Sequence, residues 1–252
     1  MYVRITKSDF NGEIVMEILV DLHCHTVAST HAHSTILENI TAAKKKGLEA
    51  IAITNHCPPL EDAPHIYHFV NLSTLPQVID GFRVFRGCEA NIINLNGDLG
   101  VDNSILKALD IVIASIHNPV YRDIGAEDNT SAYINALENP YVDIIGHSGN
   151  PRCPFDVERV LARAKELNKF IEINENTFCI RPDNVSVCKE IALCAKYLKT
   201  NVVVNSDAHI ATNVGNVERA MKILNEIDFP EELIANRSFE AFKKAISPRK
   251  QI

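Results

Sequence analysis

The sequence predicts an α/β fold in which parallel strands form a closed or nearly closed barrel. Short apolar runs alternate with helical segments about seven times, which is typical of a parallel sheet joined by helical crossovers. Hydrophobic residues make up 46% of the 252 residues and charged residues 23%, as in globular proteins with a sizeable core. No linker or shift in composition divides the chain. We therefore expect residues 1–252 to form one domain, with an N-terminal extension over 1–16 and a core over about 17–246.

The predicted strands are apolar runs too short for helices, as expected for strands that are buried on both faces of a parallel sheet. They cover residues 18–20, 48–54, 84–90, 111–116, 142–146, 170–174 and 202–205. The Asn96-Gly97 pair after the third strand indicates a hairpin-type turn. Several strands run directly into a histidine, so the strand ends are the natural place to look for chemistry.

Capping signals mark the predicted helices. Thr35 and Glu38 form a capping-box pattern that predicts a helix ending at Gly47, and Asp156 is a candidate N-cap for a later one. The main predicted helices cover residues 35–47, 68–79, 129–138, 156–167 and 184–198. A short helix is predicted from Ser104, and three C-terminal helices are predicted to begin near Asn213, Pro230 and Ser238.

The segment Asp21–Thr26 carries the first candidate metal ligands. Residues two apart in a strand point to the same face and lie about 6.6 Å apart along the backbone. The imidazoles of His23 and His25 can therefore converge on one metal ion, whereas Cys24 is expected to face the opposite side and pack.

Further candidate ligands stand at or near the ends of the other predicted strands. In parallel α/β folds the carboxyl ends of the strands meet at one face, which brings such residues together. A single histidine at a strand end is usually a structural residue, but seven of the ten histidines follow this pattern. The candidate ligands are His23, His25, His31, His56, Glu89, His117, His147, Asp207 and His209. This set exceeds what one ion needs and would serve two or three ions, with one carboxylate as a bridge.

The types of these ligands indicate the chemistry. Imidazole and carboxylate groups together suit Zn, Mn or Fe, and the absence of paired cysteines argues against a structural thiolate zinc site. Clustered divalent ions suit phosphoryl chemistry because they neutralise and orient the phosphate and generate hydroxide near neutral pH. Neither a G-x-S-x-G elbow nor a G-x-x-x-x-G-K loop is present, which argues against hydrolase-triad and NTPase functions.

Charge and cysteine content constrain the partners and the compartment. The net charge is −7 and no basic stripe is visible, so nucleic-acid binding is not favoured. The seven cysteines include no C-x-x-C pair, and no apolar stretch reaches the length of a membrane span. We expect a cytoplasmic protein with reduced thiols that acts on a small molecule and not at a membrane. The oligomeric state stays open, with a homo-oligomer as one option.

Four motifs stand out in the sequence: D-L-H-C-H-T (21–26), T-N-H (54–56), a glutamate and histidine set in mid-chain, and S-D-A-H (206–209). Further characteristic stretches are H-T-V-A-S-T-H-A (25–32), E-D-A-P-H (61–65), G-C-E-A-N-I (87–92), H-S-G-N-P (147–151) and D-F-P (228–230). Together they resemble the motifs of the PHP (polymerase and histidinol phosphatase) family, especially its YcdX-like phosphatase branch. The resemblance covers residues 17 to about 240. It implies a single-domain distorted (β/α)7 barrel, similar to a TIM barrel.

The resemblance also implies a trinuclear metal site, with zinc as the favoured ion and manganese or iron as alternatives. One ion would be held by His23, His25, Glu89 and Asp207, a second by Glu89, His117 and His147, and a third by His31, His56 and His209. The implied activity is hydrolysis of phosphate monoesters of small metabolites by a metal-bound hydroxide, with Glu89, Asp207 and His209 as the catalytic residues. Asn55 departs from the T-D-H form of the second motif, which removes a carboxylate near the third ion.

The substrate-binding residues are less clearly marked by the sequence. Arg122 is the candidate for binding phosphate oxygens, with Arg152 and Arg181 as similar candidates, and His65 is a candidate substrate contact because its loop borders the pocket in the family. The alternative function is a TatD-like metal-dependent phosphodiesterase or nuclease, which would not need all three ligands of the third ion. An amidohydrolase and a metal-binding protein without activity are the remaining options.

Overall fold

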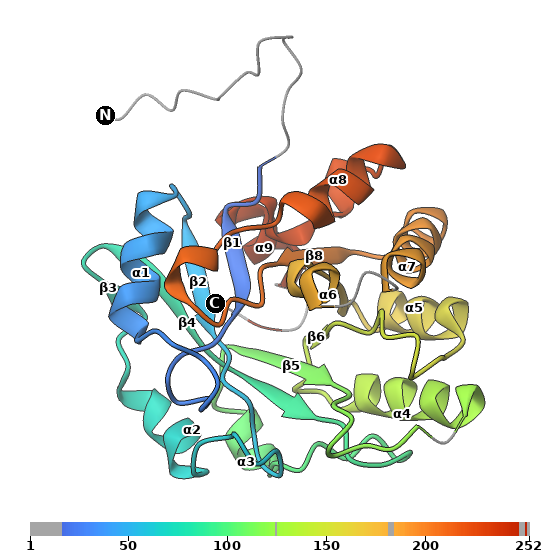
Figure 1. The fold of residues 1–252 in the computed structure, drawn as a ribbon, viewed down its shortest axis with the longest axis horizontal. Coiled ribbons are helices and arrows are strands. Elements are labelled where there is room, and N and C mark those ends of the chain that lie inside the picture. Colours follow the sequence, from blue (N-terminus) through green and yellow to red (C-terminus); the bar gives the residue numbers. More distant parts are fainter. Residues whose placement is uncertain (1–16, 124, 181–183, 247–249, 251–252) are drawn as a thin grey trace, which may run out of the picture.

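The computed structural model describes residues 17–123, 125–180, 184–246 and 250, and its strands surround a common centre with the helices outside them (Figure 1). Seven parallel strands pair in chain order: β1 (Val20–Cys24), β2 (Ala50–Ile53), β4 (Phe82–Asn91), β5 (Ile111–Ser115), β6 (Ile144–Ile145), β7 (Phe170–Asn174) and β8 (Val202–Asn205). The predicted α/β fold with a nearly closed seven-stranded barrel, similar to a TIM barrel, is confirmed.

The first and last strands meet through a single bridge, without forming a full ladder. Cys24 and Ala208 form a parallel bridge, and the backbone N–H of His25 donates to the Ala208 carbonyl at 2.8 Å. The side chain of Asn205 on β8 completes the contact, because its Oδ1 accepts from the Leu22 N–H at 2.9 Å. The barrel is therefore closed next to the first and last sequence motifs.

Nine α-helices lie among the described residues: α1 (Ile36–Lys45), α2 (Tyr67–Asn71), α3 (Asn103–Leu106), α4 (Ala126–Glu138), α5 (Val157–Glu166), α6 (Glu175–Ile180), α7 (Asn184–Leu198), α8 (Glu218–Glu226) and α9 (Phe239–Ile246). The capping box of Thr35 and Glu38 is present at α1. Asp156 caps α5 by accepting from the Arg159 N–H at 3.0 Å. In Figure 1, α4, α5 and α7 lie together on one side of the barrel and α1 lies on the other. No helix among the described residues has the length and apolar character needed to cross a membrane.

The prediction of one helix over residues 68–79 is wrong. Helix α2 ends at Asn71, a 3-10 turn follows (η1, Leu72–Thr74), and β3 (Val78–Ile79) then pairs antiparallel with β4. Pro76 is the cause, because the residue before a proline is driven out of the helical region, and Leu75 is extended. Asp80 and Gly81 both have positive φ, as a tight hairpin turn requires.

Other predicted boundaries also shift. The segment near Asn213 forms only a 3-10 turn (η2, Ala211–Asn213) before α8, and the segment after Pro230 forms two more (η3, Glu231–Leu233; η4, Ala235–Arg237). The Asn96-Gly97 turn closes through a hydrogen bond from the Gly97 N–H to the Asn94 carbonyl, but it joins no pair of strands. Helix α6 was missed by the sequence analysis because it begins directly after β7 without a loop.

The inside of the barrel is filled by one apolar cluster with a residue from every parallel strand. Its members include Val20, Leu22, Ala50, Ala52, Phe85, Ile111, Ile113, Ile144, Phe170 and Val203. Phe242 and Ile246 of α9 join this cluster and close one end of the barrel. A strand places alternate residues on one face, so the residues two or four positions beyond this layer also point inward.

Candidate metal centre

The alternation of the strands carries the candidate ligands into the mouth of the barrel. Beyond Phe85 on β4 the same face presents Gly87 and then Glu89. In the same way, the inward positions beyond Ala52 and Ile113 lead to His56 and His117. The apolar cluster inside the barrel, called the apolar plug below, and the polar residues at the strand ends therefore lie on the same inward face of several strands, at every second residue.

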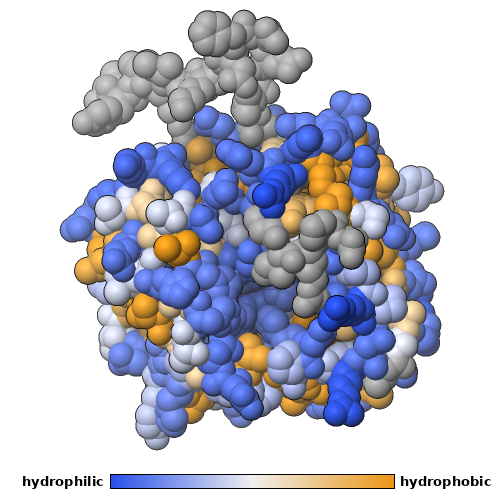
Figure 2. All heavy atoms as spheres, viewed as in Figure 1, coloured by the Kyte–Doolittle hydropathy of each residue, from blue (hydrophilic) through white to orange (hydrophobic). Residues whose placement is uncertain are grey.

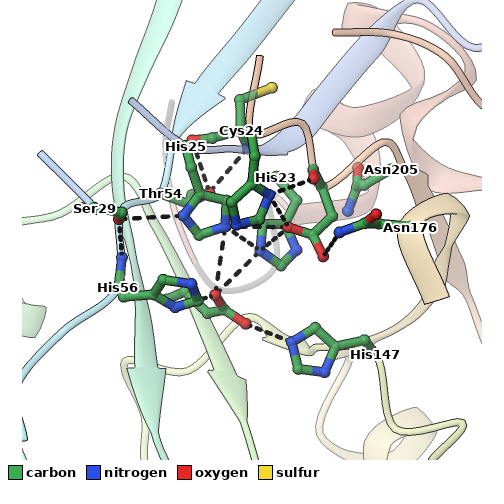
Figure 3. Close-up of polar contacts among 12 residues, drawn as sticks. His23, Cys24, His25, Ser29, Thr54, His56, His147, Asn176 and Asn205 are labelled. Atoms are coloured by element: carbon green, nitrogen blue, oxygen red, sulfur yellow. Dashed lines mark hydrogen bonds and ion pairs between the residues drawn. The ribbon is translucent and has the colours of Figure 1, made fainter. Parts of the chain in front are cut away.

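In β1, the histidine ligands face into the barrel because the strand contains an irregularity. Val20 and Leu22 pack inside the barrel, so strict alternation would turn Cys24 inward as well. The pairing of β1 with β2 shifts between Asp21 and Cys24, and Cys24 packs in a different apolar cluster. Figure 3 shows the Cys24 sulfur directed away from the imidazoles of His23 and His25. The expected opposite orientation of Cys24 is confirmed, and the bulge supplies it.

Four ligand atoms at the end of β1 and its neighbours form a small cage. The Nε2 atoms of His23 and His25 lie 3.1 Å apart. Asp207 Oδ1 lies 3.5 Å and 3.2 Å from these two nitrogens, and Glu89 Oε2 lies 3.4 Å and 3.5 Å from them. Ligands at about 2.0–2.2 Å from a tetrahedral zinc ion are separated by roughly 3.4 Å. The distances between the two nitrogens, and from each oxygen to both nitrogens, therefore match those of a zinc site.

Glu89 is the centre of the larger cluster and is fully buried. Its Oε1 lies 2.7 Å from His147 Nε2 and 3.4 Å from His117 Nε2, and its Oε2 lies 2.8 Å from His56 Nδ1. The rings of His23, His25, His56 and His147 converge in Figure 3. One carboxylate thus contacts ligands of every predicted group, which is the position that a bridging ligand requires.

Asp207 and His209 come from the loop after β8. Asp207 has a φ of 52°, a left-handed conformation that non-glycine residues seldom adopt and that often marks functional sites. His209 Nδ1 donates to the Asp207 carbonyl at 2.9 Å, and its ring stacks on His25 at 4.3 Å between centroids. The strained backbone therefore directs both side chains into the cluster.

The predicted third group lies at the outer edge of the cluster. The ring of His31 lies 5.2 Å from that of His56 and 4.5 Å from that of His209. Ligand atoms within 4.8 Å of one another, however, form the sets His25–His56–His209 and His31–His56–Asp62. The structure thus brings all nine predicted ligands into one cluster and adds Asp62, which the sequence analysis did not select.

The electrostatics of the cluster depend on its carboxylates. Burial alone would raise the pKa of Glu89 and of Asp207, but the surrounding histidines, His56 for Glu89 and His23 for Asp207, hold both pKa values well below their usual range. Burial would likewise lower the pKa of His147, but Glu89 raises it to about 9. Both carboxylates are therefore anionic and available to bind cations.

Unpaired buried atoms test whether the residues fit a metal. Glu89 Oε2, Asp207 Oδ1 and His56 Nδ1 are buried and make no hydrogen bond, although buried polar atoms are almost always paired. The nitrogen and oxygen atoms of this set suit Zn, Mn or Fe. Together with the cage dimensions, these unpaired atoms show that the residues fit divalent metal ions.

Glu172 on β7 is a buried residue of this site that the sequence analysis missed. Its Oε1 accepts from His23 Nδ1 and Asn205 Nδ2, both at 2.8 Å. Its Oε2 accepts from the His147 N–H at 2.8 Å and from Asn174 Nδ2 at 3.0 Å. Carboxylates that accept from the far nitrogen of a ligand histidine fix its tautomer and orientation. Its signal in the sequence was an acidic residue two positions beyond the inward-facing Phe170.

Replacement of Glu172 with Gln should weaken metal binding. All four partners of the carboxylate are donors, so the amide NH2 of glutamine would face another donor and release His23 or His147. We expect a loss of roughly 10–100-fold in zinc affinity, measured by competition with a chromophoric chelator. Glu175→Gln is the matched control, because Glu175 is also buried but accepts from the Ala220 N–H on α8. Equal zinc affinities in both variants and the wild type would contradict this role.

A cavity with a volume of about 550 Å³ lies over the cluster. It is lined by His31, His56, Leu60, Asp62, Ile116, His117, Asn118, Pro119, His147, Asn150, Asn176, Thr177, Asp207 and His209. The face seen in Figure 2 is hollowed near its middle, where hydrophilic residues gather. No lysine or arginine of the described chain is among the lining residues.

The predicted substrate-binding residues lie away from this cavity. Arg122, Arg152 and His65 are exposed and are not among its lining residues. Arg181 lies outside the described residues. Sequence reasoning instead missed the amides of Asn118 and Asn150 in loops and of Asn176 in α6, because single asparagines carry no distinctive pattern.

Asn55 contacts residues that hold the ligand histidines in place. Its Oδ1 accepts from the Thr26 N–H at 2.8 Å and from the Ser29 hydroxyl at 3.1 Å. Ser29 Oγ in turn accepts from the His56 N–H at 3.0 Å and lies 3.4 Å from His25 Nδ1. Asn55 therefore organises the first loop around His25 and His56 through Ser29, without supplying a charge.

Comparison with known proteins identifies a family and several relatives. A family model described as "PHP domain" matches residues 21–180. A protein of Caldanaerobacter subterraneus subsp. tengcongensis named "Probable phosphatase" is 46% identical over 242 residues, which cover 95% of each chain. Another protein named "Probable phosphatase", from Acetivibrio thermocellus, is 44% identical over 236 residues, covering 94% of this chain and 98% of that protein.

A solved structure shares the fold. The histidinol phosphate phosphatase of Lactococcus lactis subsp. lactis, whose crystal structure contains zinc, L-histidinol and phosphate, matches with a TM-score of 0.60. It is 19% identical, and the match covers 84% of this chain and 94% of that one. At this identity the likeness shows a common fold.

Proposed function

This chain belongs to the PHP domain family, and on that premise we propose that it is a metal-dependent phosphatase acting on phosphate monoesters of small metabolites. The cage formed by His23, His25, Glu89 and Asp207 is the observation that carries the proposal, because each carboxylate oxygen lies 3.2–3.5 Å from two Nε2 atoms that are 3.1 Å apart. The names of the relatives and the zinc and phosphate in the Lactococcus lactis structure support it.

We assign three divalent ions to the cluster, with zinc favoured and manganese or iron as alternatives. The cage would hold the first ion, and Glu89 Oε1 with His117 and His147 would hold the second. His31, His56 and His209 would hold the third. Glu89 contacts imidazoles of all three groups, which supports its role as the bridge.

When bound, clustered divalent ions supply hydroxide near neutral pH and neutralise the charge of the phosphoryl group. Glu89 and Asp207 hold the positions of those ions and balance their charge, and His209 stands where the cluster opens to the cavity. Glu172 and Asn91 each accept from the Nδ1 atom of a ligand histidine, His23 and His117, so that Nε2 faces the centre. The chain thus provides positioning, and it needs no serine or cysteine nucleophile.

The cavity favours a small substrate with an uncharged or weakly polar leaving group. Its volume of about 550 Å³ suits a metabolite, and its walls combine Leu60, Ile116 and Pro119 with three asparagine amides. Arg122 and His65 remain proposed substrate contacts only for parts of a substrate that extend beyond this cavity. The net charge of −7 weighs against nucleic acid as the substrate.

The rates on p-nitrophenyl phosphate and bis-p-nitrophenyl phosphate test the proposal. We expect the purified protein, supplied with Zn²⁺ or Mn²⁺, to prefer the monoester by at least about tenfold in kcat/KM, a difference of roughly 1.4 kcal/mol in transition-state binding. A preference for the diester would favour a TatD-like phosphodiesterase or nuclease. Failure to hydrolyse either ester with Zn²⁺ or with Mn²⁺ would contradict a phosphatase.

A further inference from the structure

Asp62 shares an unusual property with the proposed ligands. Its Oδ2 atom is buried and makes no hydrogen bond, as is true of Glu89 Oε2, Asp207 Oδ1 and His56 Nδ1. Such atoms are rare in folded proteins, and each one calls for a missing partner. Ten such atoms occur among the described side chains, and the six besides these four belong to residues that are not predicted ligands. Asp62 Oδ2 differs from those six because it lies beside His31 and His56, so a metal ion would be a partner common to it and the three ligand atoms.

The position of Asp62 agrees with this explanation. Asp62 lies in the loop between β2 and α2, and its Oδ2 lies 2.6 Å from His31 Nδ1. Asp62, His31 and His56 each offer a ligand atom within 4.8 Å of the other two. The Thr30 N–H donates to the Asp62 carbonyl at 3.0 Å, which holds this loop against the one that carries His31.

We propose that Asp62 is a direct ligand of the third metal ion, beside His31, His56 and His209. This inference rests on the proposed trinuclear site. Three neutral imidazoles bring no negative charge to a divalent ion, and a carboxylate completes a nitrogen-and-oxygen set of the kind that zinc binds. Asn55 brings no negative charge to the surroundings of the third ion. Asp62 would bring one as a direct ligand.

The third ion is then the outermost of the three. The side chains of His31, His209 and Asp62 are 52%, 21% and 20% exposed, whereas that of Glu89 is fully buried. Asp62 and Leu60 of the same loop line the cavity. Asp62 would therefore contact the third ion and also form part of the cavity wall. Because of this, loss of the ion should change substrate binding as well as rate.

Asp62→Asn separates direct ligation from mere orientation of His31. Asparagine keeps an oxygen that can accept from His31 Nδ1, but it removes the negative charge that makes a carboxylate a good ligand. After dialysis against buffer with micromolar Zn²⁺, we expect the wild type to retain three ions per chain and Asp62→Asn two, counted by plasma mass spectrometry. Glu61→Gln is the matched control: it removes an exposed charge from the same loop and should retain three ions.

Asp62→Asn with three ions at wild-type affinity would overturn the role of Asp62 and leave the proposed phosphatase intact. A wild type that binds only two ions would instead overturn the trinuclear site itself, and with it this role. If Asp62→Asn does not fold, Asp62→Cys loaded with Co²⁺ gives a second test. A ligand at position 62 should produce a thiolate-to-cobalt charge-transfer band that Glu61→Cys lacks, and absence of the band would refute direct ligation.

Discussion

Glu89→Gln should reduce kcat/KM for a phosphate monoester by about 10³-fold or more, because metal stabilisation of a phosphoryl transition state contributes several kcal/mol. The glutamine is nearly isosteric but uncharged. It would leave His56 and His147, which now lie 2.8 Å and 2.7 Å from the carboxylate, without their shared anion. We also expect fewer than two ions per chain, since the carboxylate contacts all three groups of ligands.

The measurement for this variant is metal content and steady-state kinetics on the same preparation. Circular dichroism should show an unchanged fold, because the apolar plug of the barrel lies one layer below Glu89. Glu175→Gln again serves as the control for removal of a buried carboxylate near the site. A Glu89→Gln protein with wild-type metal content and rate would contradict the role of Glu89 as the bridging metal ligand.

Removal of the metal ions should abolish the activity and lower the thermal stability. Ligands that bind only the folded state at about 100 times their Kd contribute about 2.7 kcal/mol of stability. For a chain of this size that corresponds to a decrease of roughly 5–10 °C in Tm on chelation. Differential scanning fluorimetry with and without a chelator measures this change. An unchanged Tm would mean that the cluster of Glu89, Asp207 and the histidines holds no ion.

Much of the fold and the site could be predicted because several strands keep a strict two-residue period. The inward positions of β4, which include Phe85, lead without interruption to Glu89, and those of β5 lead to His117. Each such strand has apolar residues inside the barrel and a polar residue at its carboxyl end. Because the parallel strands pair in chain order, the order also predicts which carboxyl ends lie next to one another. Seven short apolar runs, six of them with a candidate histidine or acid at or near the end, were enough to indicate both.

The rest of the site could not be predicted because it depends on departures from that regularity. The bulge in β1 reverses the alternation after Leu22, and only this reversal lets Leu22 and His23 both face inward. The positive φ values of Asp207 and His147 turn loop residues back toward the centre. Neither departure has a local signal, since no glycine stands at these positions.

Contacts between distant loops were also beyond the sequence. Asp62 meets His31 only because the loop after β2 folds across the loop after β1, with Thr30 hydrogen-bonded to it. Glu172 could have been found from its period, because it follows the inward-facing Phe170 by two residues and an acid inside a buried strand needs partners. Arg122 was selected because it follows His117 closely and because guanidinium suits phosphate oxygens, and in the structure it is exposed and is not among the residues that line the cavity.

The central claim is that this chain hydrolyses phosphate monoesters with a cluster of divalent metal ions. The most direct test is to strip the protein with a chelator, return Zn²⁺ in measured equivalents, and follow the rate on p-nitrophenyl phosphate. The account predicts no activity in the stripped protein and a rate that rises until three equivalents per chain are bound. Full activity in the stripped protein would contradict it.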